Sequence, residues 1–208
     1  MLTASQPPLR PAGLAAPQPV LPALVLHPDW QADLLASVPA ELRRAMLSQD
    51  AMRQRIMARL YLKLGIREPD QRAMRPDDRH ILATLASAPQ RFMGLAGLTW
   101  HARALGRAIT PGAIKPLLED FPPADIAIAV SLKLFAPVKG AGLPGSAAEA
   151  RKSGERLVQA WAEAAGLGLD RIAALTMSKD TALSHPPAPV NAQQAGIILA
   201  ALAYRMAS

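Results

Sequence analysis

The stretch GLAGLTWHARALGRAIT, residues 94–110, combines small and aliphatic side chains at helical spacing. Its apolar positions recur every three or four residues, as on one face of an α-helix, and are Leu95, Leu98, Ala102, Leu105 and Ile109. The pattern predicts one helix over residues 89–108 with that face in a core. Gly94 and Gly97 favour a helix packed closely on a neighbour over a phosphate-binding loop, because no strand precedes them and no nucleotide-binding motif matches.

The same stretch raises the question of catalysis, since Trp100, His101 and two arginines occur together. Neighbouring residues of a helix diverge by about 100°, so the indole and the imidazole cannot share a face. No carboxylate in this segment could orient His101 as a general base, and no nucleophile lies in a recognised turn nearby. We therefore interpret Trp100 as a core-edge or interface residue, and His101 as either a surface residue or an internally hydrogen-bonded one.

Helix signals continue on both sides of this stretch. Apolar spacing and capping residues predict a turn at His27 and Pro28 and helices over residues 29–35, 40–64, 77–87, 147–165, 169–177 and 192–206. A further short helix is expected to begin at Pro111, and Pro116 should limit or kink it. Gly65 is expected to end the second of these helices. A capping box at Ser146 and Glu149 and a cap at Asn191 are expected to begin two others.

The pattern over residues 124–135 fits two structures. Ile126, Ile128 and Val130 alternate as in a half-buried strand, yet Ile126, Val130 and Leu134 also form a helical line. An isolated strand would leave its backbone groups without partners, and no second convincing strand is present, so helix is favoured. The predicted fold class is therefore mainly α, an irregular multi-helix bundle with one lobe or two.

The beginning of the chain is expected to form a disordered, proline-rich arm. Six prolines fall within the first 24 of 208 residues. They interrupt any apolar run long enough for a signal-peptide core or a membrane span. Behind the arm, residues 1–23, we expect a helical domain with a basic surface over 24–137 and a flexible loop over 138–148. A C-terminal helical segment, 149–208, is expected to pack on the same domain.

Composition argues against several kinds of site. The chain has no cysteine, which removes disulfides, thiolate metal sites and thiol nucleophiles and fits a reducing compartment such as the cytoplasm. The four histidines lack the spacing of zinc ligands, and no calcium-loop pattern occurs; they are His27, His80, His101 and His185. We expect no metal, no cofactor, no small-molecule substrate and no catalytic residue.

The net charge of +7 is concentrated in the middle of the chain. Residues 41–107 contain 13 Arg and Lys against 6 Asp and Glu, whereas the remainder contains 10 of each. Within this block Arg55, Arg59 and Lys63 form a basic line at four-residue steps. Such a line fits a solvated helix face, a nucleic-acid site, an anionic membrane surface or an acidic protein partner. Only Tyr61 adds the kind of aromatic ring that nucleic-acid sites interleave with cations.

Four segments carry a resemblance to a known family: LHPDW (26–30), GLTWHARALGRAI (97–109), LLEDFPPADIAIAVSLKL (117–134) and LVQAWAEAAGLGLDRIAALTM (157–177). Together they resemble the SctK-type (YscK/PscK-like) accessory proteins of the bacterial type III secretion sorting platform. The resemblance implies a non-enzymatic, mainly helical adaptor that links the cytoplasmic domain of the inner-membrane ring protein to the pod protein. It also implies a location at the cytoplasmic face of the inner membrane through those partners.

The leading hypothesis is accordingly a cytoplasmic scaffold without enzymatic activity. The residues expected to contact partners are Trp30, Arg55, Arg59, Lys63, Trp100, Arg103 and Arg107. The alternative is a helical nucleic-acid-binding or regulatory protein that uses the basic block, residues 43–107. A third hypothesis is a small helical enzyme with a site assembled from His101 and distant acids.

Overall fold

Helices are the only regular secondary structure in the part of the chain that the structure describes. The computed structural model describes residues 24–66, 73–108, 111–138, 142–180 and 190–207. Within these ranges the helices are α1 (Pro28–Leu34), α2 (Ala40–Ser48), α3 (Asp50–Leu64), α4 (Pro76–Ser87), α5 (Pro89–Trp100), α6 (Ala102–Leu105), α7 (Pro111–Leu118), α8 (Pro123–Ser131), α9 (Ala147–Ala165), α10 (Leu169–Ala174) and α12 (Ala192–Ala207). The predicted mainly α, multi-helix fold is confirmed for these residues. The arm predicted over residues 1–23 lies outside them.

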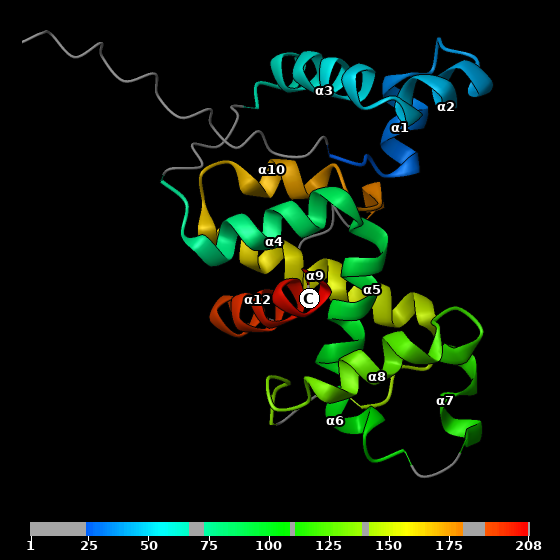
Figure 1. Cartoon of the computed structure of the whole chain (residues 1–208), viewed down its shortest axis with the longest axis vertical. Helices are drawn as coiled ribbons and strands as arrows, with labels where there is room; N and C mark the ends of the chain where they lie inside the picture. Colours follow the sequence, from blue (N-terminus) through cyan, green and yellow to red (C-terminus); the bar gives the residue numbers. More distant parts are fainter. Residues whose placement is uncertain (1–23, 67–72, 109–110, 139–141, 181–189, 208) are drawn as a thin grey trace, which may run out of the picture.

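Helix α5 lies at the centre of the bundle, where it packs against α4, α8, α9 and α12 (Figure 1). The apolar face predicted for it is confirmed, since its described members are all buried: Leu95, Leu98, Ala102 and Leu105. Ile109 lies outside the described residues. Side chains of α9 and α12 belong to the same apolar core as those of α4 and α5, so early and late parts of the chain bury one another.

Helices α5 and α9 cross at glycines, which brings their backbones into contact. A Cβ atom on Gly97 would lie 1.7 Å from the carbonyl oxygen of Ala150, and one on Gly154 would lie 1.8 Å from that of Met93. Each glycine therefore directs a Cα hydrogen toward a carbonyl of the other helix, where any larger residue would collide. The prediction that Gly97 marks close packing on a neighbour is confirmed.

The single helix predicted over residues 89–108 is wrong, because the structure divides it at His101. Helix α5 ends at Trp100, and α6 follows as one short turn. The backbone of His101 has φ −91° and ψ 4°, and its imidazole is hydrogen-bonded to Gly142 and Ser153, which lie 41 and 52 residues further along the chain. Because both partners are distant in sequence, no local signal marks the break.

The single helix predicted over residues 40–64 is also wrong. Gln49 is extended, with φ −93° and ψ 118°, and separates α2 from α3. The hydroxyl of Ser48 donates back to the carbonyl of Ala45 at 2.8 Å, which competes with the continuation of α2. Asp50 then provides a negative charge at the first position of α3, where the helix dipole favours it.

Local capping signals are confirmed at three helix ends. Gly65 follows α3 in the left-handed conformation, with φ 62°. The hydroxyl of Ser146 accepts a hydrogen bond from the backbone N–H of Glu149 at 3.2 Å, at the start of α9. The carboxylate of Glu149 accepts from the N–H of Gly145 at 2.7 Å and not from that of Ser146, so this half of the predicted capping box is wrong. The side chain of Asn191 accepts one from the N–H of Gln193 at 2.9 Å, at the start of α12. Each of these signals involves residues within four positions of one another.

The ambiguous segment, residues 124–135, is helical up to Ser131, as favoured from its lack of a strand partner, whereas residues 132–135 form a turn and not the end of the helix. Helix α8 covers Pro123–Ser131, and the chain continues through a turn to residue 138. Helix α9 begins at Ala147, inside the loop predicted over residues 138–148. The first turn of α9 therefore replaces the end of that loop.

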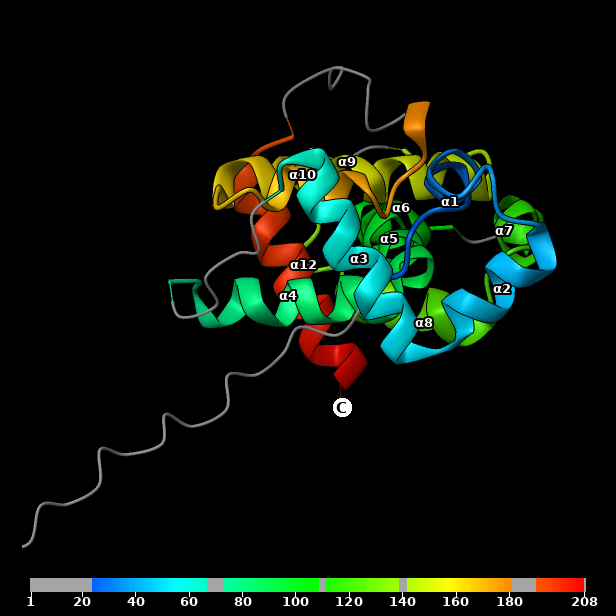
Figure 2. The same cartoon turned by 90° about the horizontal axis from the view of Figure 1, so that it is seen from above.

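The helices are distributed along the long axis of the molecule. Helices α2 and α3 lie at one end, outside α4 and α10, and helices α6, α7 and α8 lie at the opposite end (Figure 1). Figure 2, seen from the α3 end, shows α3 crossing over the bundle and α2 running toward its side. Within the described residues, no helix has both the length and the apolar character that a bilayer span requires.

Candidate functional site

The outer face of α3 carries three cations and an exposed leucine on one stripe. Arg55, Arg59 and Lys63 are exposed, and no described carboxylate forms an ion pair with them. Leu62, which is 83% exposed, lies seven residues after Arg55 and three after Arg59, so it shares their stripe. We call Arg55, Arg59, Leu62 and Lys63 the α3 surface.

The opposite side of α3 holds this surface on the core. Met57 and Leu60 are buried there. At the C-terminal end, the guanidinium of Arg171 on α10 donates to the carbonyl of Gly65 at 3.5 Å. The cations of the α3 surface therefore project from a helix whose opposite side contributes Met57 and Leu60 to the apolar core.

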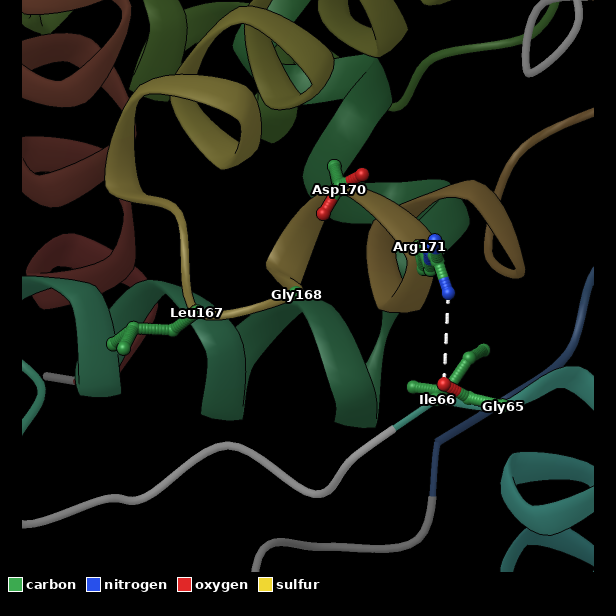
Figure 3. A pocket seen from close by; sticks show the side chains of 6 residues that line it. All are labelled: Gly65, Ile66, Leu167, Gly168, Asp170 and Arg171. Atoms are coloured by element: carbon green, nitrogen blue, oxygen red, sulfur yellow. Dashed lines mark hydrogen bonds between the residues drawn. The ribbon is translucent and has the colours of Figure 1, made fainter.

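A groove of about 490 Å³ lies next to this surface, between the end of α3 and the loop from α9 to α10 (Figure 3). Its lining residues are Gly65, Ile66, Leu167, Gly168, Asp170 and Arg171. Leu167 has a positive φ of 57° between two glycines that also have positive φ. Among the described residues, the charged groups of the lining are one carboxylate and one guanidinium, and they form no cluster of catalytic groups. The groove offers contact area beside α3.

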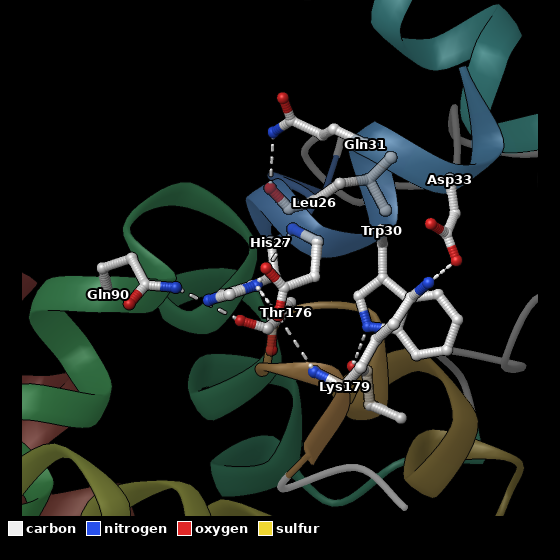
Figure 4. Close-up of polar contacts among 10 residues, drawn as sticks. Leu26, His27, Trp30, Gln31, Asp33, Gln90, Thr176 and Lys179 are labelled. Carbon is white, nitrogen blue, oxygen red and sulfur yellow. Dashed lines mark hydrogen bonds and ion pairs between the residues drawn. The ribbon is translucent and has the colours of Figure 1, made fainter. Parts of the chain in front are cut away.

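Trp30 serves as an internal anchor for α1. Its indole N–H donates to the carbonyl of Ala174 at 2.9 Å, and the ammonium of Lys179 lies 5.1 Å from the ring centroid. Lys179 also pairs with Asp33 of α1 (Figure 4). The polar atom of the half-buried indole is therefore engaged within the chain, and a cation covers its ring. The structure thus places Trp30 in a fold-stabilising contact, whereas the sequence interpretation made it a partner anchor.

The other predicted contact residues lie at the end of α5, in α6 and just after it, and α6 lies at the end of the molecule away from α3 (Figure 1). Trp100 is half-buried and packs against the core. The Nε of Arg103 donates to the carbonyl of Ala136 at 3.0 Å, so this guanidinium holds the turn after α8. Arg107 follows α6 and is exposed. The predicted residues therefore do not form one surface.

The basic block contains cations that are neutralised within the fold. The Nη2 of Arg91 on α5 lies 2.8 Å from Oδ1 of the buried Asp125 on α8. Arg75 forms a second pair with the buried Asp78, with Nε 2.7 Å from Oδ2. Part of the positive charge counted from the sequence is thus neutralised within the fold, whereas the three cations of the α3 surface have no ion-pair partner among the described carboxylates.

The carboxylate of Asp78 connects α4 to α9. Besides its two hydrogen bonds from Arg75, it accepts one from the indole Nε1 of the buried Trp161 at 2.8 Å. Burial acts to raise the pKa of Asp78, but the hydrogen bonds from Arg75 and Trp161 outweigh it, so that the pKa lies below its ordinary value. The sequence pattern does not identify this contact, because Trp161 is 83 residues away.

His101 is the internally hydrogen-bonded residue that one of the two sequence interpretations expected. Its Nδ1 lies 2.6 Å from the carbonyl oxygen of Gly142, and its Nε2 lies 3.1 Å from the hydroxyl of Ser153. A carbonyl only accepts, so we assign the proton to Nδ1. Burial lowers the pKa of His101, against the hydrogen bond to Gly142 and the charge of Glu149, which raise it. The neutral ring therefore joins the loop before α9 to the α5–α6 break.

Among the described residues, no carboxylate forms a hydrogen bond with the side chain of Ser153 or His101. The imidazole of His101 is oriented by the backbone carbonyl of Gly142. The hydroxyl of Ser153 lies within α9 and has the carbonyl of Glu149 as a second possible acceptor, at 3.1 Å. We therefore interpret this contact as a structural tie between loop and helix.

Among the described residues, no group of three or more His, Cys, Asp or Glu side chains is arranged to hold a metal ion. Comparison of the chain with models of protein families, with characterised proteins and with solved structures finds no match.

The sequence interpretation assigned no role to Leu62, although its position between Arg59 and Lys63 on the same stripe could have identified it. The α3 surface is the candidate functional site.

Proposed function

We propose that this chain is a non-enzymatic adaptor that binds a partner protein through the α3 surface. The supporting observation is the combination, on one docked helix, of three exposed cations without described carboxylate partners and a leucine that is 83% exposed. Attraction between such cations and an acidic partner raises the encounter rate and sets the orientation. Burial of the leucine in the partner supplies affinity.

The partners are proposed from the resemblance to the SctK-type family. On that basis the chain links the cytoplasmic domain of the inner-membrane ring protein to the pod protein of a type III secretion sorting platform. It would reach the inner membrane only through these partners. The elongated arrangement, with α3 at one end of the long axis (Figure 1), suits a protein that contacts two partners on different sides.

The test is capture of the purified ring domain and pod protein by the Arg55→Glu, Arg59→Glu double variant. Reversing two charges should lower the association rate for one of these partners by roughly tenfold, with a larger effect at low salt. Both side chains are exposed, so the circular dichroism spectrum and the melting temperature should stay unchanged. Capture of both partners at the wild-type rate would refute the role of the α3 surface.

A matched control uses Lys115→Glu with Lys152→Glu. These lysines are exposed on α7 and α9, and the exchange changes the net charge by the same amount at sites away from α3. Equal loss of capture in the control would show that total charge, not the α3 surface, governs binding.

A salt titration with duplex DNA distinguishes the adaptor from the nucleic-acid-binding alternative. The exposed apolar residue of the α3 surface is leucine, not an aromatic ring on which bases stack. We expect negligible binding at physiological salt. Tight binding that falls steeply with salt and is lost in the arginine double variant would replace the adaptor proposal.

A further inference from the structure

A second exposed apolar surface lies at the turn that follows α8. Leu134 is 79% exposed and Val138 is 83% exposed, and Phe135 between them is partly exposed. Ile197 on α12 is also exposed. It lies one helical turn after Gln194, whose side-chain amide donates to the carbonyl of Phe135, so it extends the same region. We call Leu134, Phe135, Val138 and Ile197 the turn patch.

Hydrogen bonds hold the backbone of the turn that carries this patch. The backbone N–H of Phe135 donates to the carbonyl of Leu132 at 2.9 Å. The buried Ala136 accepts a hydrogen bond from Nε of Arg103 at 3.0 Å, and the side chain of Gln194 reaches the neighbouring carbonyl. Contacts from two other helices therefore fix the backbone while Leu134 projects into solvent. Leucine and valine exposed to this degree on a fixed turn present an unfavourable apolar surface to water.

The charged side chains of the described segments that form the turn patch are positive. Lys133 and Arg107 are both exposed. A Cβ atom on Gly106 would lie 4.0 Å from Cδ of Lys133, which places the end of α6 beside the turn. The three segments that meet here, residues 101–108, 126–138 and 190–207, contain no aspartate or glutamate. A partner that covers the patch would therefore meet cations without competing carboxylates on these segments.

We propose that the turn patch is a docking surface for an acidic segment of a partner protein that carries apolar side chains. The apolar residues of the segment cover Leu134 and Val138, and its carboxylates face Lys133 and Arg107. The patch follows α8, which lies at the end of the molecule away from α3 (Figure 1), so it suits the second partner of an adaptor. That assignment rests on the proposed function. Binding of the acidic segment itself does not depend on that assignment.

A protein segment fits this surface better than an anionic membrane. Helices that lie on membranes present a long apolar face with basic residues along it. The turn patch is instead built from one turn and one residue of a neighbouring helix, which suits a short complementary segment.

The absence of cysteine makes a site-specific test possible. A Ser131→Cys variant carries a polarity-sensitive fluorophore at the exposed end of α8, beside the patch. The probes are three synthetic 14-residue peptides: one of glutamate and leucine, one with lysine in place of glutamate, and one with serine in place of leucine. We expect saturable binding of the glutamate–leucine peptide alone. The Leu134→Ser, Val138→Ser double variant should bind it at least tenfold more weakly, and Lys133→Glu should also weaken it.

The matched control is Leu62→Ser, because Leu62 is as exposed as Val138 but belongs to the α3 surface. It should leave the signal from the Ser131→Cys label unchanged, as should the Arg55→Glu, Arg59→Glu double variant. The α3 experiment and this titration therefore fail independently. No saturable response, equal binding of the lysine peptide, a response unaffected by the Leu134 and Val138 exchanges, or a response to anionic phospholipid vesicles in place of the peptide would overturn the proposal.

Discussion

Replacement of Gly97 by alanine tests the close crossing of α5 and α9 on which the bundle is centred. The added Cβ would lie 1.7 Å from the carbonyl oxygen of Ala150, whereas ordinary contact begins near 3.4 Å. The atom that it meets is backbone, so no side-chain rotation relieves the clash. The two helices must part or turn by about 1.7 Å, the difference between these two distances, at a crossing where Gly97, Ala150 and Gly154 are all buried.

The Gly97→Ala exchange should lower the free energy of unfolding by about 3 kcal/mol, the upper end of the range for overpacking a core. For a protein of this size that corresponds to a fall in melting temperature of roughly 6–12 °C. The assay is thermal and urea unfolding followed by circular dichroism. Gly112→Ala is the control, because nothing lies within 4 Å of the Cβ it would add in α7. It should leave stability unchanged or raise it by about 0.4–1 kcal/mol.

The reciprocal glycine makes the mechanism testable. A Cβ on Gly154 would lie 1.8 Å from the carbonyl oxygen of Met93 at the same crossing, so Gly154→Ala should cost about as much as Gly97→Ala. Once the first alanine has forced the helices apart, the second meets less resistance. The double variant should therefore lose clearly less than the sum of the two single losses. A Gly97→Ala protein with wild-type unfolding, or strictly additive losses, would refute the reasoning.

Two further predictions concern buried polar contacts. Asp78→Ala leaves the indole N–H of Trp161 buried without its acceptor, so urea unfolding should show a free energy of unfolding that is lower by about 1–3 kcal/mol. Asp78→Asn keeps an acceptor oxygen and should lose less stability. Equal losses in the two variants would contradict this role of the carboxylate. Burial lowers the pKa of His101 in the folded protein below its unfolded value of about 6.5, so the unfolded chain binds the proton more readily. Stability should therefore be full above that value and decline as the pH falls through it. Melting temperatures between roughly pH 7.5 and 5 should show a smaller decline for His101→Gln than for the wild type. Identical pH profiles would argue against the buried neutral imidazole.

The candidate site was only partly predictable. The basic line Arg55, Arg59 and Lys63 follows from four-residue spacing on a helix, and the structure places all three at the surface. Trp30 carries no local sign that its indole meets the carbonyl of Ala174, 144 residues away. The turn patch was not predictable either, because the exposure of Leu134 depends on which neighbouring residues take the buried positions.

The sequence by itself determined the helical class and many of the helix ends. Gly65, Ser146 and Asn191 act on backbone groups within four residues, so their effect can be read locally. The alternation over residues 124–135 did not produce a strand, because a strand needs a partner that the chain does not offer.

Only the tertiary structure decided what His101 contacts at the end of α5, which helices cross at glycine and which cations have no carboxylate partner among the described residues. The imidazole of His101, at the break, meets Gly142 and Ser153, and Gly97 crosses α9 at Gly154, 57 positions later. These outcomes are set by contacts between residues far apart along the chain. Residue spacing and helix propensity depend only on residues close together in the sequence, so they do not predict such contacts.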